Sequence, residues 1–376
     1  MGMKTKIPLI KPFVGKEELL EVKAVLESGW LSQGEAMRSF EKELGTYLGA
    51  RHVVSTSSCT TALSLAIEAL RLKPRSEVIV PDFTHPATAN VVSRAGLAPV
   101  IADVRLDTYG ISVDALKRSI TSRTSAIIAV HPFGHPFELD EVRELASGRG
   151  LELIEDAATA IGTKYKGNLI GKSGRAVCFS FHPRKLLTTG EGGCLATDDD
   201  GVAELARAMR SHGEVKDASG SHFVYNGLNY RLSDVNAALG LAQLRKIGAL
   251  MTRRRKMAKV YKDGIVADRI RATPPIEEAY GYHTYQSYVV RLDNSADRDR
   301  CKSRLKEEFG IETQVGTYSL HMQPAFAKCR GSALENGSRL YRSTLTLPLY
   351  HTLSDVDQTF VISALGKVVG RDPGSN

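Results

Sequence analysis

Cysteine is scarce in this chain of 376 residues, and no two cysteines form a Cys-x-x-Cys pair. The five are Cys59, Cys178, Cys194, Cys301 and Cys329. A sparse, odd set of this kind excludes a disulfide framework and a structural zinc site, so we expect reduced thiols. His131 and His135 are four residues apart, but Pro132 and Gly134 prevent the helical face that a zinc pair needs. We therefore predict no metal site.

Long hydrophobic runs are also missing, and no stretch approaches the roughly 18 apolar residues of a transmembrane helix. The apolar stretch at residues 7–10 is too short for the core of a signal peptide. There is no collagen-like period, internal repeat or low-complexity tract. Hydrophobic residues make up 42% and charged residues 24%, as in folded soluble proteins. We expect a cytoplasmic protein without a membrane partner.

An acidic excess is absent too, because 50 Lys and Arg against 42 Asp and Glu leave a net charge of +8. These cations are spread along the chain, and the longest run is Arg253–Lys256. We predict that this run is a solvated helix face. No nucleic-acid-reading motif accompanies the charge, so we expect no nucleic-acid partner. A small anionic ligand explains a mild basic excess equally well.

Short apolar strands alternate with helical segments in the first half of the chain. The strands are predicted at 78–81, 99–103, 125–130 and 151–156, and the helices between them at 87–95, 113–120 and 140–147. This alternation indicates βαβ units and a mainly parallel sheet covered on both faces. Two more strands, 176–181 and 193–197, enclose a Thr- and Gly-rich segment.

The pattern changes in the second half. A long helix is predicted over 233–257, followed by a strand at 287–292 and helices near 297–309 and 354–368. We predict a large α/β domain over 1–245 and a smaller α+β domain over 246–376.

Three features occur in an order that fits one cofactor. Small hydroxyl residues open a helix near Ser58, and the free N–H groups of a helix N-terminus bind phosphate. Asp156 ends an apolar strand, where parallel sheets bind ligands. Lys185 lies in a turn before a glycine-rich return. Pyridoxal 5′-phosphate needs all three: an anchor for its phosphate, an acid for its pyridine nitrogen, and a lysine that binds it and moves protons.

These residues lie within segments that resemble the DegT family of nucleotide-sugar aminotransferases, which are pyridoxal-phosphate enzymes of fold type I. The matching segments are SGWLSQG at 28–34, SCTTAL at 58–63, PDFTHPATAN at 81–90, HPFG at 131–134, EDAA at 155–158, SFHPRKLLTTGEGG at 180–193, RSHG at 210–213, GLNYRLS at 227–233, AALGLAQL at 237–244 and HMQP at 321–324. The resemblance implies a mainly parallel seven-stranded sheet in the large domain and a homodimer with shared active sites.

The resemblance also implies roles for the residues that bind the cofactor. Lys185 would carry the cofactor and act as general acid and base, and Asp156 would pair with the pyridine nitrogen. Ser180 and the backbone of Cys59 and Thr60 would hold the phosphate. A lysine at 185, where sugar-dehydrating relatives have histidine, points to transamination.

Other roles concern the partner subunit and the substrate. Asn229 would reach the cofactor phosphate of the neighbouring subunit. Tyr318 and His321 lie in the segment that lines the sugar-nucleotide site of the family.

Three positions depart from the family pattern. His85 stands where an aromatic residue usually stacks on the cofactor ring, and imidazole also titrates. Thr159 replaces a longer Gln or His that reaches near the phenolic oxygen of the cofactor. Cys59 stands where glycine is common, which is tolerable if only its N–H is used.

The resemblance therefore implies an aminotransferase that moves an amino group from L-glutamate to a keto sugar of a nucleoside diphosphate sugar. A keto-cyclitol aminotransferase of aminoglycoside biosynthesis, acting on a compound such as scyllo-inosose, is an alternative. A catalytically inactive cofactor-binding regulator is another, suggested by His85 and Thr159.

Overall fold

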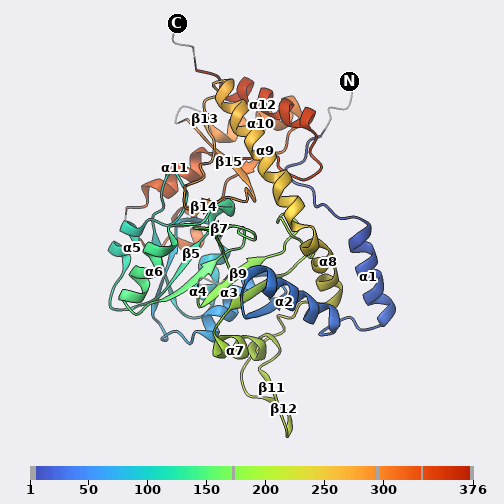
Figure 1. Cartoon of the computed structure of the whole chain (residues 1–376). Coiled ribbons are helices and arrows are strands. Elements are labelled where there is room, and N and C mark those ends of the chain that lie inside the picture. Colours follow the sequence, from blue (N-terminus) through green and yellow to red (C-terminus); the bar gives the residue numbers. More distant parts are fainter. Residues whose placement is uncertain (1–5, 172–173, 294–296, 332, 373–376) are drawn as a thin grey trace.

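The larger part of the protein is built on a central eight-stranded sheet (Figure 1). The computed structural model describes residues 6–171, 174–293, 297–331 and 333–372. The strand order is β1 (His52–Thr56), β10 (Gly193–Thr197), β9 (Ala176–Ser180), β6 (Glu152–Asp156), β5 (Thr124–Val130), β2 (Glu77–Pro81), β4 (Ala98–Ala102) and β18 (Arg330–Gly331). Strand β10 runs antiparallel to both of its neighbours, and the other adjacent pairs are parallel. The seven-stranded, mainly parallel sheet is thus confirmed, with β18 as an eighth strand at the edge.

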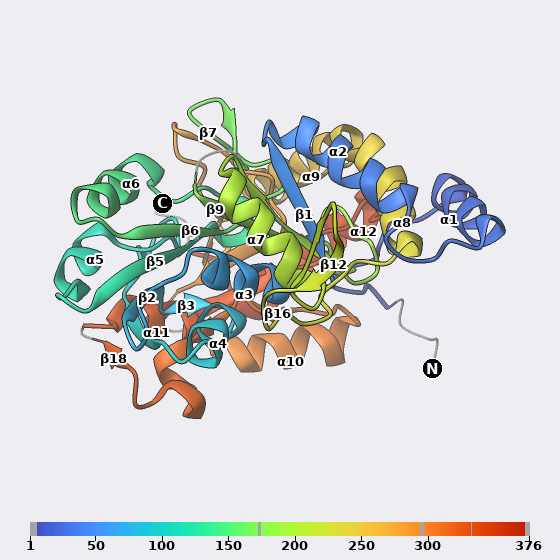
Figure 2. The same ribbon diagram turned by 90° about the horizontal axis from the view of Figure 1, so that it is seen from below.

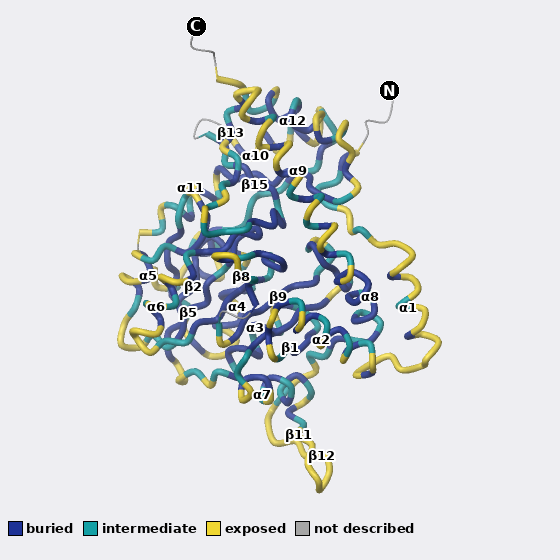
Figure 3. Tube along the Cα trace, viewed as in Figure 1, coloured by how far each residue is buried: buried dark blue, intermediate teal, exposed yellow. Residues whose placement is uncertain are grey.

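Side chains alternate between two apolar layers along the inner strands, because successive residues of a strand point to opposite faces. In β2, Ile79 belongs to one buried cluster, and Val78 and Val80 belong to the other. The first face is covered by α2 (Glu35–Leu48), α5 (Val113–Ser119), α6 (Leu139–Gly148) and α8 (Asp234–Arg245). The second face is covered by α3 (Cys59–Ala69), α4 (Ala87–Arg94) and α7 (Asp200–Arg210). Figure 2 shows β9, β6, β5 and β2 side by side, and Figure 3 shows β9, β5 and β2 as mostly buried.

A second group of elements follows in the chain. It contains a four-stranded sheet of β13 (Ala272–Thr273), β15 (Tyr288–Leu292), β19 (Thr344–Leu347) and β16 (Gln314–Val315). Helices α9 (Ile247–Ala267), α10 (Arg298–Phe309), α11 (Glu335–Ser343) and α12 (Asp355–Val369) accompany it. The predicted strand at 287–292 and the predicted helices near 297–309 and 354–368 are confirmed. The domain division at residues 245 and 246 remains a proposal.

The prediction of one helix over 233–257 is wrong. Two helices occupy this stretch, and the chain leaves helical geometry at Lys246, with φ −106° and ψ 6°. The ammonium of Lys246 pairs with the buried Glu18 of α1 (Lys16–Ser28). This contact joins residues more than 200 positions apart, and no proline or glycine at 246 signals the break.

The prediction of a solvated face for Arg253–Lys256 is wrong for Arg254. Its side chain is buried, and its Nη1 donates to the carbonyls of Tyr285, Gln286 and Leu349. Arg255 stacks on Tyr282 at 4.0 Å. Helix α9 is covered on this side by the segment around 285, which hydropathy alone did not reveal.

No helix among the described residues is long and apolar enough to cross a membrane.

Candidate functional site

A cavity of about 600 Å³ opens at the carboxyl ends of the parallel strands. The large sheet contributes the last residues of three neighbouring strands: Val130, Asp156 and Ser180. Later segments around 286, 314–318 and 346–349 close the other side, and Leu9 and Ile10 complete the wall. In open parallel sheets this end is where ligands bind.

Lys185 lines this cavity from a turn that follows β9. Its N–H donates to the carbonyl of His182 at 2.8 Å. Burial lowers the pKa of the Lys185 ammonium, and the nearby Cys59 and Asp156 oppose that shift. A lysine with a lowered pKa is more readily neutral, which suits a nucleophile and a proton carrier.

Asp156, the last residue of β6, presents a buried carboxylate to the same cavity. One oxygen accepts the hydroxyl of Thr88 at 2.8 Å, and the other accepts the N–H of Ala158 at 3.1 Å. These two bonds fix the plane of the carboxylate. Sequence reasoning missed Thr88. Its only signal was its place at the start of α4, four residues after Thr84. The hydroxyls of these two threonines lie 3.1 Å apart.

The N-terminus of α3 forms another wall. Ser58 caps the helix by accepting the N–H of Thr61 at 3.2 Å, while the first N–H groups of a helix have no partner inside it. Strand β10 passes so close that a Cβ on Gly193 would overlap the backbone of Ser58 and Cys59. Burial raises the pKa of the Cys59 thiol, so that side chain stays neutral. The wall therefore offers backbone donors to an anion.

The other two positions that depart from the family pattern, His85 and Thr159, also line the cavity. His85 accepts the N–H of Ala87 through Nδ1 at 3.2 Å, and burial followed by the charge of Lys185 lowers its pKa. The ring is therefore neutral with its hydrogen on Nε2. Thr159 donates to the carbonyl of His131 at 2.8 Å. The Thr159 hydroxyl therefore bonds to the backbone and does not take the place of the longer Gln or His side chain of the family.

Only one of the two predicted substrate residues lines the cavity. Tyr318, in β17 (Tyr318–Ser319), lines the cavity. His321 lies outside the lining: its Nδ1 is 2.9 Å from the buried Asp82, and its Nε2 is 3.1 Å from Ser338.

Asn229 is exposed and lies outside the cavity of its own chain. Its Oδ1 accepts the N–H of Arg231 at 3.4 Å. Within one chain, the structure therefore brings together every predicted cofactor residue except Asn229.

Known proteins resemble this chain in sequence and in fold. The DegT/DnrJ/EryC1/StrS aminotransferase family matches residues 12–366. The chain belongs to this family. Its fold is therefore that of fold type I pyridoxal-phosphate enzymes, and the predicted resemblance is confirmed. Family membership also makes the protein a pyridoxal-phosphate-dependent aminotransferase, which argues against an inactive regulator.

Individual relatives cover almost the whole chain. The spore coat polysaccharide biosynthesis protein SpsC of Bacillus subtilis is 37% identical and covers 96% of this chain and 97% of its own. Spr1654 of Streptococcus pneumoniae, described as a putative sugar aminotransferase and solved in a PLP form, superposes with a TM-score of 0.91 at 26% identity over 97% and 98% of the two chains. DesI, solved in the presence of its TDP-sugar product, superposes with a TM-score of 0.88 at 30% identity over 96% and 92%.

Proposed function

We propose that this aminotransferase moves an amino group from L-glutamate to a keto sugar linked to a nucleoside diphosphate. One observation carries the proposal: the lysine, the acid and the helix N-terminus line a single cavity. The relation to SpsC and to DesI supports a sugar as acceptor, and the TDP-sugar of DesI supports a nucleotide carrier.

The cavity residues fit the cofactor. Lys185 would bind it covalently, Asp156 would hold a proton on its ring nitrogen, and the Cys59 and Thr60 backbone with Ser180 would hold its phosphate. The bound cofactor supplies an electron sink at the carbon that carries the amine. Within each half-reaction, Lys185 would move a proton from the carbon on one side of the transferred amine nitrogen to the carbon on its other side, which the lowered pKa of Lys185 assists.

The mouth of the cavity favours an anionic substrate. Arg184 lines the cavity and is exposed, and its Nη1 donates to the Oε1 of Gln314, another lining residue, at 3.0 Å. Tyr318 offers an aromatic face nearby. A diphosphate would complement Arg184, whereas a cyclitol carries no such charge. Parallel assays with a TDP-keto sugar and with scyllo-inosose distinguish the two acceptors, and we expect turnover with the first.

We also propose a homodimer with shared sites. Apolar side chains are exposed on two segments, 30–31 and 223–228: Trp30, Leu31, Phe223, Val224 and Leu228. The N–H of Asp234 donates to the carbonyl of Leu31 at 3.0 Å, which ties the first segment to the start of α8, six residues after Leu228. Exposed apolar side chains of this kind mark protein interfaces, and the exposed Asn229 follows Leu228 directly in the chain. A second copy would cover these side chains and receive Asn229.

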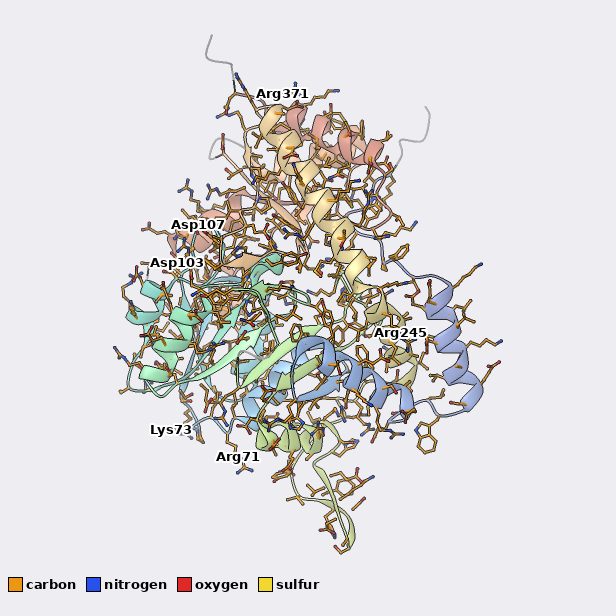
Figure 4. The ribbon with its side chains drawn as sticks, in the orientation of Figure 1. Arg71, Lys73, Asp103, Asp107, Arg245 and Arg371 are labelled. Atoms are coloured by element: carbon orange, nitrogen blue, oxygen red, sulfur yellow. The ribbon has the colours of Figure 1, made fainter. Side chains whose placement is uncertain are left out.

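Helix α1 extends the same exposed region. It stands at the side of the molecule, and Arg245 of α8 reaches toward it and pairs with Glu21 (Figure 4). Leu19, Leu20 and Leu26 face solvent on this helix. Because α1 is held to α8 on one side and exposes leucines on the other, a second copy of the chain could bury the exposed side.

We further propose a cytoplasmic location, since all five cysteines are free thiols.

The visible absorbance spectrum tests the reaction. We expect a band from the lysine-bound cofactor that fades when L-glutamate is added and returns with the keto sugar. Lys185→Ala should bind cofactor without this band and lose turnover, whereas the surface variant Lys216→Ala should behave as wild type. Full activity of Lys185→Ala would overturn the mechanism, and a band unaffected by glutamate would exclude that donor.

A further inference from the structure

A single buried amide holds the backbone on both sides of Lys185. The Oε1 of Gln286 accepts the N–H of Leu186 at 2.7 Å, and its Nε2 donates to the carbonyl of Arg184 at 2.6 Å. These groups belong to the two peptide bonds that flank Lys185. Gln286 is only 4% exposed and also lines the cavity.

The backbone of Gln286 is itself anchored. Arg254 of α9 donates through Nη1 to the carbonyl of Gln286 at 2.8 Å and to that of Tyr285 at 3.2 Å. Burial lowers the pKa of the Arg254 guanidinium to about 10, so it remains charged near neutral pH. Hydrogen bonds that involve a charged donor are stronger than neutral ones. A chain of bonds thus runs from α9 through Gln286 to the lysine turn.

We infer that Gln286 is a positioning residue for Lys185, and this inference rests on the proposed role of that lysine. The Lys185 side chain is long and flexible, so the place of its amine depends on how firmly its own backbone is held. A displacement of about 1 Å in a reacting group can cost roughly 100-fold in rate. Gln286 lies about 100 residues further along the chain, and its two bonds limit such displacement of the Lys185 backbone.

The two bonds require a neutral amide, because one partner is a donor and the other an acceptor. Glutamate at 286 could still accept from Leu186 but would place an oxygen against the carbonyl of Arg184. Methionine would fill similar space with neither bond and without charge. Comparing Gln286→Glu with Gln286→Met therefore separates the effect of the bonds from the effect of a new charge.

Gln358→Glu is a matched control. Gln358 is equally buried, and its Nε2 donates to the carbonyl of Met257 at 2.6 Å, away from the cavity. We expect kcat to fall about 100-fold in both Gln286 variants, with KM for glutamate and for the keto sugar nearly unchanged. The control should keep the kcat of the wild type.

Hydrogen exchange supplies a readout that is independent of turnover. In the apoprotein, the Leu186 amide should exchange at least about tenfold faster in Gln286→Met, where its acceptor is lost, than in Gln286→Glu, where an acceptor remains. The control should leave this amide protected. Wild-type protection in Gln286→Met, or a wild-type kcat in that variant, would overturn the inference.

The residue to which the cofactor attaches shows whether a negative result contradicts the positioning role of Gln286 or the proposed role of Lys185. Borohydride reduction of the wild-type holoenzyme, followed by peptide mapping, should place the cofactor on Lys185. A label on another residue would overturn the proposed role of Lys185 itself. A label on Lys185 together with an unaffected Gln286→Met would overturn only the positioning role.

Discussion

Single side chains in this protein orient reactive groups through short, defined bonds. Asp156 has a carboxylate whose plane is set by the Thr88 hydroxyl and the Ala158 N–H. Thr88 is itself buried and lies near Thr84. Hydrogen bonds to a charged group are worth roughly 1.5–3 kcal/mol. The orientation of the acid therefore depends on a residue outside the motif that contains it.

The variant Thr88→Val keeps the shape of the side chain and removes this donor. We expect cofactor affinity to fall about tenfold or more, because the carboxylate loses one of its two bonds. Titration of the apoenzyme with pyridoxal phosphate measures the change. Thr344→Val removes a buried hydroxyl bond to Leu340 outside the cavity and is the control. Equal affinities in the two variants would contradict the role of Thr88.

At the scale of elements, the proposed phosphate site depends on how closely β10 approaches the start of α3. Gly193 occupies the crossing, where a methyl group would overlap the backbone of Ser58 and Cys59. The same strand pairs with β9, which ends at Ser180. One strand thereby sets the distance between the two proposed phosphate-binding groups.

We expect Gly193→Ala to push α3 away from β10. Overpacking of this kind typically costs about 1–3 kcal/mol in stability, and cofactor affinity should fall with it. Thermal unfolding of the apoenzyme and cofactor titration measure the two effects. Gly248→Ala in α9 meets no atom within 4 Å and should be neutral or slightly stabilising. A Gly193→Ala protein with wild-type values in both measurements would exclude this account.

At the scale of the molecule, the cavity combines parts of the chain that are far apart in sequence. Its wall includes Leu9 near the start, Asp156 in the large sheet and Leu349 near the end. Asn229, the remaining predicted cofactor residue, lies outside the cavity of its own chain, directly after the exposed Leu228. A complete site in this proposal needs two copies of the chain.

Complementation between two inactive variants tests that proposal. If Asn229 serves the partner's cofactor, a mixed dimer of Lys185→Ala and Asn229→Ala has one site with both defects and one intact site. Co-expression should restore about a quarter of wild-type activity, because half of the dimers are mixed in a symmetric assembly. Co-expression of Lys185→Ala with His222→Ala, an exposed hairpin variant, should restore more, since His222 has no assigned role in the site. No recovery beyond the separate activities of Lys185→Ala and Asn229→Ala would show that Asn229 acts within its own chain or in neither.

The sequence by itself determined the alternation of strands and helices and the parallel sheet, and it carries the proposal that Lys185 and Asp156 bind the cofactor. Local apolar periodicity and short motifs carry that information, because each depends on residues close together in the chain. Tertiary structure alone decided the break at Lys246, the burial of Arg254, the bond from Thr88 to Asp156 and the hold of Gln286 on the lysine turn. Each of these depends on a partner far away in sequence, and hydropathy patterns contain no record of which distant polar groups meet when the chain folds.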